Sequence, residues 1–237
     1  MARKNNPLMP WWRGSATIRR CLPVRLKRLV RTRLHEPPLG LVQHMHKVEG
    51  WLTDDEAGAL YRVARACPAP ALAVEIGSWY GKSSLMIAGG IRAAGGGRLY
   101  AIDPFVGAEG HCAAKGPSEK VHGYLAQFMN NIAAAELERY VSPLRGYSHE
   151  ILAHWAAPID MLFIDGEHEY EQVKRDFETW APFVRIQGYV AFHDTYAIFP
   201  GPTRLVEEQV KPPHWEVIGR ADSLTVAHKI GDGGSGL

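Results

Sequence analysis

A chain of 237 residues that is 46% hydrophobic can bury a sizeable core, and its 27 Lys and Arg against 25 Asp and Glu leave a formal net charge of only +2. No apolar run reaches the roughly 18 residues that a membrane-spanning helix needs. The three cysteines are odd in number and far apart, which argues against a disulfide framework or a zinc site and favours a reducing, cytoplasmic compartment.

The basic charge is concentrated at the N-terminus, where ten Lys or Arg and a single acid, Glu36, fall within the first 40 residues. We therefore predict a basic N-terminal arm over residues 1–45, a folded domain over 46–230 and a flexible tail over 231–237. Leucines at near-helical spacing between residues 22 and 34 predict a basic amphipathic helix in the arm. Such a helix can lie on an anionic membrane surface, or it can pack on its own domain or on a second subunit. An Arg-rich, acid-poor start is also typical of transit peptides.

After the arm, helical and strand patterns of hydrophobic residues alternate along the chain. The first predicted helix begins at Thr53, which Glu56 follows at the spacing of a capping box. The predicted helices cover residues 53–65, 83–91, 124–138, 148–156, 169–184 and 204–210. The predicted strands cover residues 71–78, 97–105, 139–148, 159–166, 188–195, 214–219 and 223–229. This alternation predicts an α/β fold, namely a Rossmann-like, doubly wound, mainly parallel seven-stranded sheet with helices on both faces. The segment 104–123 is predicted to form a loop or lid.

Polar side chains stand at the ends of the first five predicted strands. They are Glu75, Asp103, Ser148, Asp165 and the pair His193 and Asp194. In open α/β sheets, ligands bind outside the carboxyl ends of the strands. We therefore predict that these side chains meet at one edge of the sheet and form a binding site there.

The loop "EIGSWYGKSS", residues 75–84, is close to a phosphate-binding loop but does not match one. A P-loop has four residues between its first glycine and the Gly-Lys pair, whereas only three separate Gly77 from Gly81. Trp79 also breaks the glycine pattern of dinucleotide-binding loops. The remaining pattern of strand, acid, glycine, turn, glycine and helix is typical of sites for adenosine-containing ligands. At this level, another nucleotide-binding Rossmann enzyme and a non-enzymatic module that docks through its basic arm both stay open.

Two motifs resemble one family, the class I S-adenosylmethionine (SAM)-dependent methyltransferases. "VEIGSWYGKSS", which begins at Val74, resembles the family's first motif, E-x-G-x-x-x-G-x-S. Residues 160–195 resemble the D-G-x-H-x-Y … G-G-x-x-x-x-H-D signature of small-molecule O-methyltransferases, which include catechol and macrolide-sugar enzymes. Gln187 stands where that signature has its first glycine, in a predicted turn. The resemblance covers roughly residues 50–230, so it implies a methyltransferase domain over 46–230.

The resemblance implies a set of residues that bind SAM. They are Glu75, Gly77, Ser78, Trp79, Gly81, Ser83, Asp103, Ser148 and Asp165. Gly77 and Gly81 would let the backbone pass close to the ligand, and Glu75 would meet its ammonium group directly or through a water. Ser83, at a helix N-terminus, would favour the ligand's carboxylate, and Asp103 would accept hydrogen bonds from the ribose hydroxyls.

The resemblance also implies a metal site and a general base. Asp165, His193 and Asp194 match the positions that hold Mg²⁺ in catechol-type enzymes, although an imidazole suits other divalent cations better. The alternative is that Asp194 caps a turn and no metal binds. His168 matches the position of the general base, while His193 is the competing base and a solvent-facing His168 is the plain alternative. The predicted catalytic residues are therefore His168, Asp165 and His193.

The expected activity is methyl transfer from SAM to a hydroxyl of a small molecule, either a sugar or a phenolic natural product, with assistance from a divalent cation. No RNA- or DNA-reading motif is present in the sequence, so we expect no nucleic-acid partner. We expect a cytoplasmic homo-oligomer, with peripheral membrane contact through the arm as a further possibility.

Overall fold

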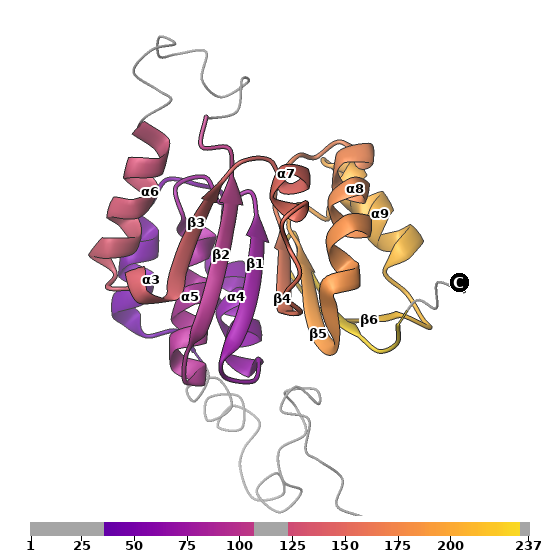
Figure 1. Cartoon of the computed structure of the whole chain (residues 1–237), viewed down its shortest axis with the longest axis horizontal. Helices are drawn as coiled ribbons and strands as arrows, with labels where there is room; N and C mark the ends of the chain where they lie inside the picture. Colours follow the sequence, from indigo (N-terminus) through magenta and orange to yellow (C-terminus); the bar gives the residue numbers. More distant parts are fainter. Residues whose placement is uncertain (1–35, 107–122, 233–237) are drawn as a thin grey trace, which may run out of the picture.

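The computed structural model describes residues 36–106 and 123–232. These residues form a single seven-stranded sheet with helices on both faces (Figure 1). The strands are β1 Ala71–Ile76, β2 Gly97–Asp103, β3 Val141–Arg145, β4 Ile159–Ile164, β5 Val184–Phe192, β6 Trp215–Ala221 and β7 Leu224–Lys229. Their order in the sheet is β3-β2-β1-β4-β5-β7-β6. The first five run parallel, β7 runs antiparallel to β5, and β6 runs antiparallel to β7. The predicted fold class is confirmed.

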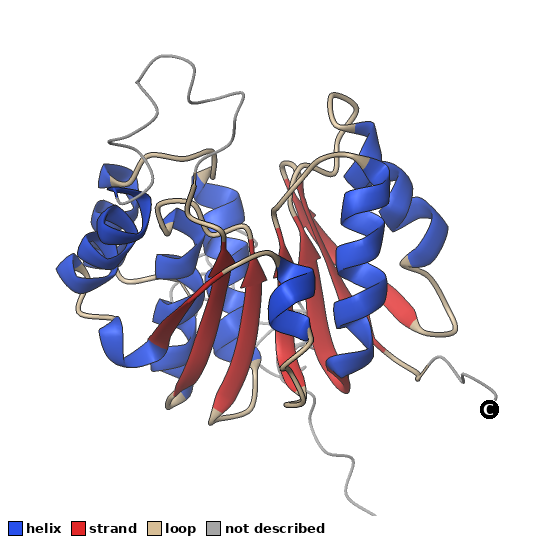
Figure 2. Cartoon of the chain, turned by 45° about the horizontal axis from the view of Figure 1, so that its top comes forward, coloured by secondary structure: helices blue, strands red, loops and turns tan. Residues whose placement is uncertain are grey.

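Helices from the two halves of the chain cover opposite faces of the sheet (Figure 2). The helices of the first face are α3 Leu39–Lys47, α4 Asp54–Ala66, α5 Lys82–Ala94 and α6 Gly123–Ala134. Those of the second face are α7 Ser148–Leu152, α8 Tyr170–Trp180 and α9 Pro200–Gln209. Alternate residues of β1 point to the two faces, so that Ala73 joins the core under α4 and α5 while Val74 joins the core under α8. Within residues 36–106 and 123–232, no helix has the length and hydropathy to cross a membrane.

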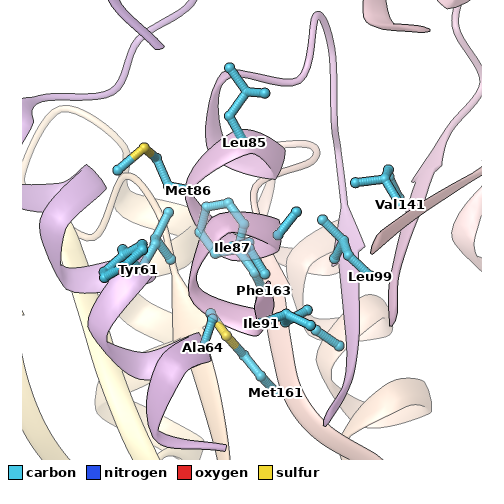
Figure 3. Close-up of a cluster of buried hydrophobic side chains, with 14 of the residues drawn as sticks. Tyr61, Ala64, Leu85, Met86, Ile87, Ile91, Leu99, Val141, Met161 and Phe163 are labelled. Carbon is cyan, nitrogen blue, oxygen red and sulfur yellow. The ribbon is translucent and has the colours of Figure 1, made fainter. Parts of the chain in front are cut away.

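The core of the first face is built around α5 (Figure 3). Leu85, Met86, Ile87 and Ile91 of this helix are fully buried and lie near Phe163 of β4. Helices α4 and α5 approach very closely because α5 carries glycine at position 90, where an added Cβ would lie 2.5 Å from the carbonyl oxygen of Tyr61. This close approach fixes the second half of α5 against α4.

Most element boundaries differ from the sequence-based prediction by a few residues, and three differences have a clear local cause. The predicted strand 188–195 begins earlier, at Val184, because Pro182 ends the preceding helix in a 3₁₀ turn, Ala181–Phe183. Gln187 lies inside this strand with a φ of +71°, beside a register irregularity, rather than in a turn between elements. The predicted Pro-Gly-Pro turn at 200–202 is the first turn of α9, where proline's missing N–H costs no hydrogen bond.

The predicted division of the chain is only partly covered by the described residues. Helix α3 spans the predicted boundary at residue 45 and packs on α5, since Leu41 lies directly against Gly89. The predicted amphipathic helix at 22–34, most of the predicted lid at 104–123 and most of the tail lie outside the described residues. The arm, its membrane contact and the homo-oligomer stay predictions.

We expect Gly90→Ala to destabilise the fold by about 1–3 kcal/mol, because its methyl group would meet the backbone of α4 and neither helix can move away cheaply. Gly40→Ala in α3 is a matched control, since no atom lies within 4 Å of the Cβ that it adds. It should be neutral or stabilising by up to about 1 kcal/mol, as alanine is the better helix former. Urea unfolding of both variants measures the difference, and equal stabilities would contradict the role given to Gly90.

Candidate active site

A cleft of about 1160 Å³ opens at the carboxyl ends of the parallel strands. It lies where the strand order reverses between β1 and β4, the position at which α/β sheets bind ligands. Its volume exceeds the range of roughly 300–1,000 Å³ typical of pockets for one small ligand, so it has room for a cofactor and an acceptor together. The predicted site residues that line it are Gly77, Ser78, Trp79, Ser83, Asp103, Ser148, Asp165, His168, His193 and Asp194.

The loop after β1 is shaped by its contact with the loop after β4. Gly77 has a φ of +85°, and a Cβ added there would lie 2.1 Å from the carbonyl oxygen of Asp165. The neighbouring loop therefore requires glycine at position 77. The sequence had predicted glycine there for a different reason, the close approach of a ligand. Gly81 also has a positive φ, but it faces the ring of Phe128, and it is not among the residues that line the cleft.

Asp103, at the end of β2, holds the loop after β1 in place. Its Oδ2 accepts hydrogen bonds from the backbone N–H groups of Ser78, at 3.0 Å, and Trp79, at 2.9 Å. Its Oδ1 accepts one from the N–H of Phe105 at 2.6 Å. The carboxylate is half-buried and lines the cleft, so it can still accept a further hydrogen bond on that side.

Glu75 does not line the cleft, contrary to the prediction that it contacts the ligand. Its side chain is fully buried at the end of β1, and the hydroxyls of Ser83, at 2.5 Å, and Ser84 donate hydrogen bonds to its two oxygens. Burial raises the pKa of Glu75 to about 7. The hydroxyl of Ser83 is thereby directed at Glu75, and both residues serve to attach the start of α5 to β1.

Three ligating side chains meet at the ends of β4 and β5. Asp165, His168 and Asp194 each place one nitrogen or oxygen within 4.8 Å of the others. His168 Nε2 lies 2.8 Å from Asp194 Oδ2, and this hydrogen bond raises the pKa of His168. The imidazole also stacks on Phe199, with ring centroids 4.2 Å apart. The sequence predicted both carboxylates of this cluster but named His193 as the third ligand.

His193 is buried behind this cluster and faces carboxylates on both sides. Its Nδ1 lies 3.1 Å from Asp165 Oδ1 and 3.2 Å from Asp194 Oδ2, while its Nε2 lies 3.3 Å from Glu56 Oε2. Burial alone would lower the pKa of His193, but these carboxylates outweigh it and raise the pKa to about 12. A doubly protonated imidazole has no lone pair for a metal. This charge state belongs to the metal-free arrangement, and the role of His193 as a metal ligand stays a prediction.

Four residues in or next to the site were not predicted from the sequence, namely Glu56, Phe199, Tyr147 and Trp51. Ser148 was predicted correctly at the cleft, although its hydroxyl donates to Asp176 of α8. Glu56 was predicted only as part of the capping box with Thr53, and Phe199 was assigned no role. Tyr147 and Trp51, both exposed aromatic residues that line the cleft, carried no spacing that could have identified them.

Residues 74–195, just over half of the chain, match the model of a family described as a methyltransferase domain. The chain therefore belongs to this methyltransferase family, and the predicted family is confirmed. A curated relative, the uncharacterised protein y4gI of Sinorhizobium fredii, is 29% identical over 127 residues. That match covers 53% of this chain but only 13% of the relative, so the chain spans a small part of that protein's length.

Solved structures share the fold at low sequence identity. The O-methyltransferase TomG from Streptomyces achromogenes, solved in complex with SAM, superposes with a TM-score of 0.59 at 18% identity, over 84% of this chain and 92% of TomG. An O-methyltransferase from Bacillus cereus, solved in complex with SAH, superposes with a TM-score of 0.56 at 16% identity, over 80% and 89% of the two chains. At these identities the likeness establishes the fold.

The charges around His193 predict how stability depends on pH. Since its pKa is raised from 6.5 to about 12, the stabilisation that it contributes is complete below pH 6.5 and declines as pH rises toward 12. Glu56 has the opposite sign, because its pKa is lowered from 4.5 to about 2 and its contribution is lost as pH falls through that range. Between about pH 6 and about pH 8.5, the free energy of unfolding of the metal-free wild type should fall. We expect this fall to be about 1–3 kcal/mol larger than that of His193→Gln over the same range. Urea titrations at the two pH values measure this, and identical slopes would contradict it.

Proposed function

We propose that the chain transfers a methyl group from SAM to a hydroxyl oxygen of a small molecule. The observation that carries this proposal is that one cleft joins a glycine-containing loop held by Asp103 to a cluster of carboxylates and histidines. Membership of the methyltransferase family supports it, as does the fold shared with TomG, solved with SAM, and with the Bacillus cereus enzyme, solved with SAH.

The β1–β2 side of the cleft suits the cofactor. Asp103 has about one lone-pair position left for a ribose hydroxyl, on Oδ1, because its three backbone hydrogen bonds use both positions of Oδ2 and one of Oδ1. The first N–H groups of α5 favour the cofactor's carboxylate. Ser148, Ser78 and Trp79 line the same part of the cleft and complete the binding surface.

The β4–β5 side suits a divalent cation. Asp165 and Asp194 supply oxygen ligands of the kind that Mg²⁺ prefers, whereas a nitrogen ligand from His168 would suit Mn²⁺ or Zn²⁺ and would take that imidazole out of base catalysis. The buried Nδ1 of His193 lies close to both carboxylates without a well-directed hydrogen bond, which is consistent with a cluster adapted to a further charged group. A bound cation would lower the pKa of the acceptor hydroxyl and help to orient it.

Methyl transfer to oxygen also requires removal of the hydroxyl proton. His168 is placed at the cleft wall to accept it, because the Asp194 carboxylate and the Phe199 ring hold its imidazole in one orientation. Asp194 plays the part of the group that orients the base and stabilises its protonated form. His193 is less suited to this task, since carboxylates already face both of its nitrogens.

Cofactor binding is the first test of the proposal. Calorimetry should detect binding of SAM and SAH to the wild-type protein, and Asp103→Ala should weaken SAM binding by about 1–3 kcal/mol because a ribose hydroxyl loses its acceptor. His154→Ala, an exposed residue outside the cleft, is the control and should bind as wild type does. Folded wild-type protein that binds neither ligand would overturn the proposal.

The second test concerns the base. Methyl transfer from labelled SAM to a panel of catechols and glycosylated macrolides identifies an acceptor, with which kcat is then measured against pH. We expect the acid limb above pH 6.5, because Asp194 raises the pKa of His168 from that value. His168→Ala should lose about 10²–10⁴-fold in kcat, the usual contribution of a general base, with SAM affinity unchanged.

Chelation and Mn²⁺ titration separate the base from a ligand. If His168→Ala lowers kcat but binds Mn²⁺ as wild type does, His168 is the base; if Mn²⁺ affinity falls in parallel, it is a ligand. Full activity after exhaustive chelation would remove the cation from the proposal. A variant that keeps wild-type kcat and the same acid limb would remove His168 as the base.

A further inference from the structure

Helix α4 places a buried carboxylate behind the reaction centre, in a position that does not line the cleft. Glu56 is only 2% exposed, although an acidic side chain is almost never fully buried unless it is paired. Its Oε2 accepts a hydrogen bond from the N–H of Thr53 at 2.9 Å and lies 3.3 Å from His193 Nε2. Its Oε1 accepts hydrogen bonds from the N–H of Ser223, at 2.9 Å, and from the Ser223 hydroxyl, at 2.6 Å.

We propose that Glu56 is a positioning residue, which holds the His193 ring so that its other nitrogen lies between Asp165 and Asp194. The inference rests on the function proposed above, since Asp165 and Asp194 are the carboxylates assigned to the cation. Glu56 touches neither cofactor nor acceptor in this scheme, and it acts only through His193.

The geometry gives the imidazole one orientation. With Nε2 facing Glu56, Nδ1 is directed into the space between the two carboxylates, at 3.1 and 3.2 Å from them. Phe163 also lies near the ring, with centroids 6.4 Å apart and the planes nearly perpendicular, and it offers no hydrogen bond. A carboxylate on the far nitrogen of a histidine fixes both the proton position and the ring orientation at the near nitrogen.

The same side chain also fixes the segment that carries Asp194. Ser223, which donates twice to Glu56, accepts hydrogen bonds through its carbonyl oxygen from the N–H of Thr195, at 2.8 Å, and from the Thr195 hydroxyl, at 2.6 Å. Glu56 thus connects α4, the turn between β6 and β7 and the end of β5. The capping box at the start of α4 explains only one of its four contacts.

Three variants separate positioning from ordinary stabilisation. Glu56→Gln keeps the size of the side chain but removes the charge that faces His193. Thr53→Ala removes the capping hydroxyl and its bond to Asp222, and Ser223→Ala removes one donor to Glu56, while both keep the carboxylate beside His193. All three should lose stability, but only Glu56→Gln should disturb the reaction centre.

The first readout is the ¹⁵N spectrum of the imidazoles in metal-free protein, with the His193 signals assigned through His193→Gln. We expect Glu56→Gln to shift the Nε2 resonance of His193 and to change its protonation pattern, whereas Thr53→Ala and Ser223→Ala leave both as in wild type. The second readout is the affinity for Mn²⁺, which should fall by up to about 10-fold in Glu56→Gln, the lower end of the range for outer partners of a metal site, because Glu56 acts through His193 on the ligand carboxylates Asp165 and Asp194. SAM affinity should stay within about twofold in all three.

Unchanged His193 resonances and unchanged Mn²⁺ affinity in Glu56→Gln would overturn the proposal. If Glu56→Gln does not fold, Glu56→Asp replaces it: the charge is kept but withdrawn by one methylene, so the Nε2 signal should still shift. If wild-type protein binds no Mn²⁺, the cation part of the proposed function fails, and the imidazole spectra alone decide whether Glu56 holds His193.

Discussion

The site depends on the contact between the backbone at Gly77 and the carbonyl oxygen of Asp165. An added Cβ at position 77 would lie 2.1 Å from that oxygen, so the loops after β1 and β4 touch without any side chain between them. The first loop carries the surface that suits a nucleoside, and the second carries Asp165 and His168. Because they touch, a cofactor bound to the first loop, as proposed, would come within reach of Asp165 and His168 on the second. The parallel sheet places both loops at one edge, and the absence of a side chain at Gly77 lets their backbones come into contact.

The two histidines of the site have different environments, which separates their roles. His193 is 5% exposed and has carboxylates at both nitrogens, so its charge serves to hold Asp165 and Asp194 side by side. His168 has a 42% exposed side chain and one carboxylate partner, and it lines the cleft. Burial and the number of partners, rather than position along the motif, therefore decide which imidazole can exchange a proton with an acceptor.

The sequence predicted most of the fold and the edge on which the site lies, because both follow from local patterns. Buried strands are read from apolar runs, and the carboxyl ends of parallel strands must meet, so Asp103, Asp165 and Asp194 were assigned to one place. It could not predict which way a polar side chain turns. Glu75 faces the hydroxyls of α5 instead of the cleft, and Glu56 reaches a histidine 137 residues away, which no local spacing records.

The charge of the cleft bears on how the proposed reaction turns over. Within the described residues, nine carboxylates line it against three cationic side chains; the acids are Glu49, Asp103, Glu150, Asp165, Glu167, Glu169, Glu171, Asp176 and Asp194, and the cations are Lys82, Arg175 and the protonated His193. A cleft of one sign raises the local concentration of ligands of the other sign. SAM carries a sulfonium charge that its demethylated product lacks, so the acidic lining favours the cofactor over the product. In the proposed reaction, the same field would disfavour acceptors with phosphate or carboxylate groups.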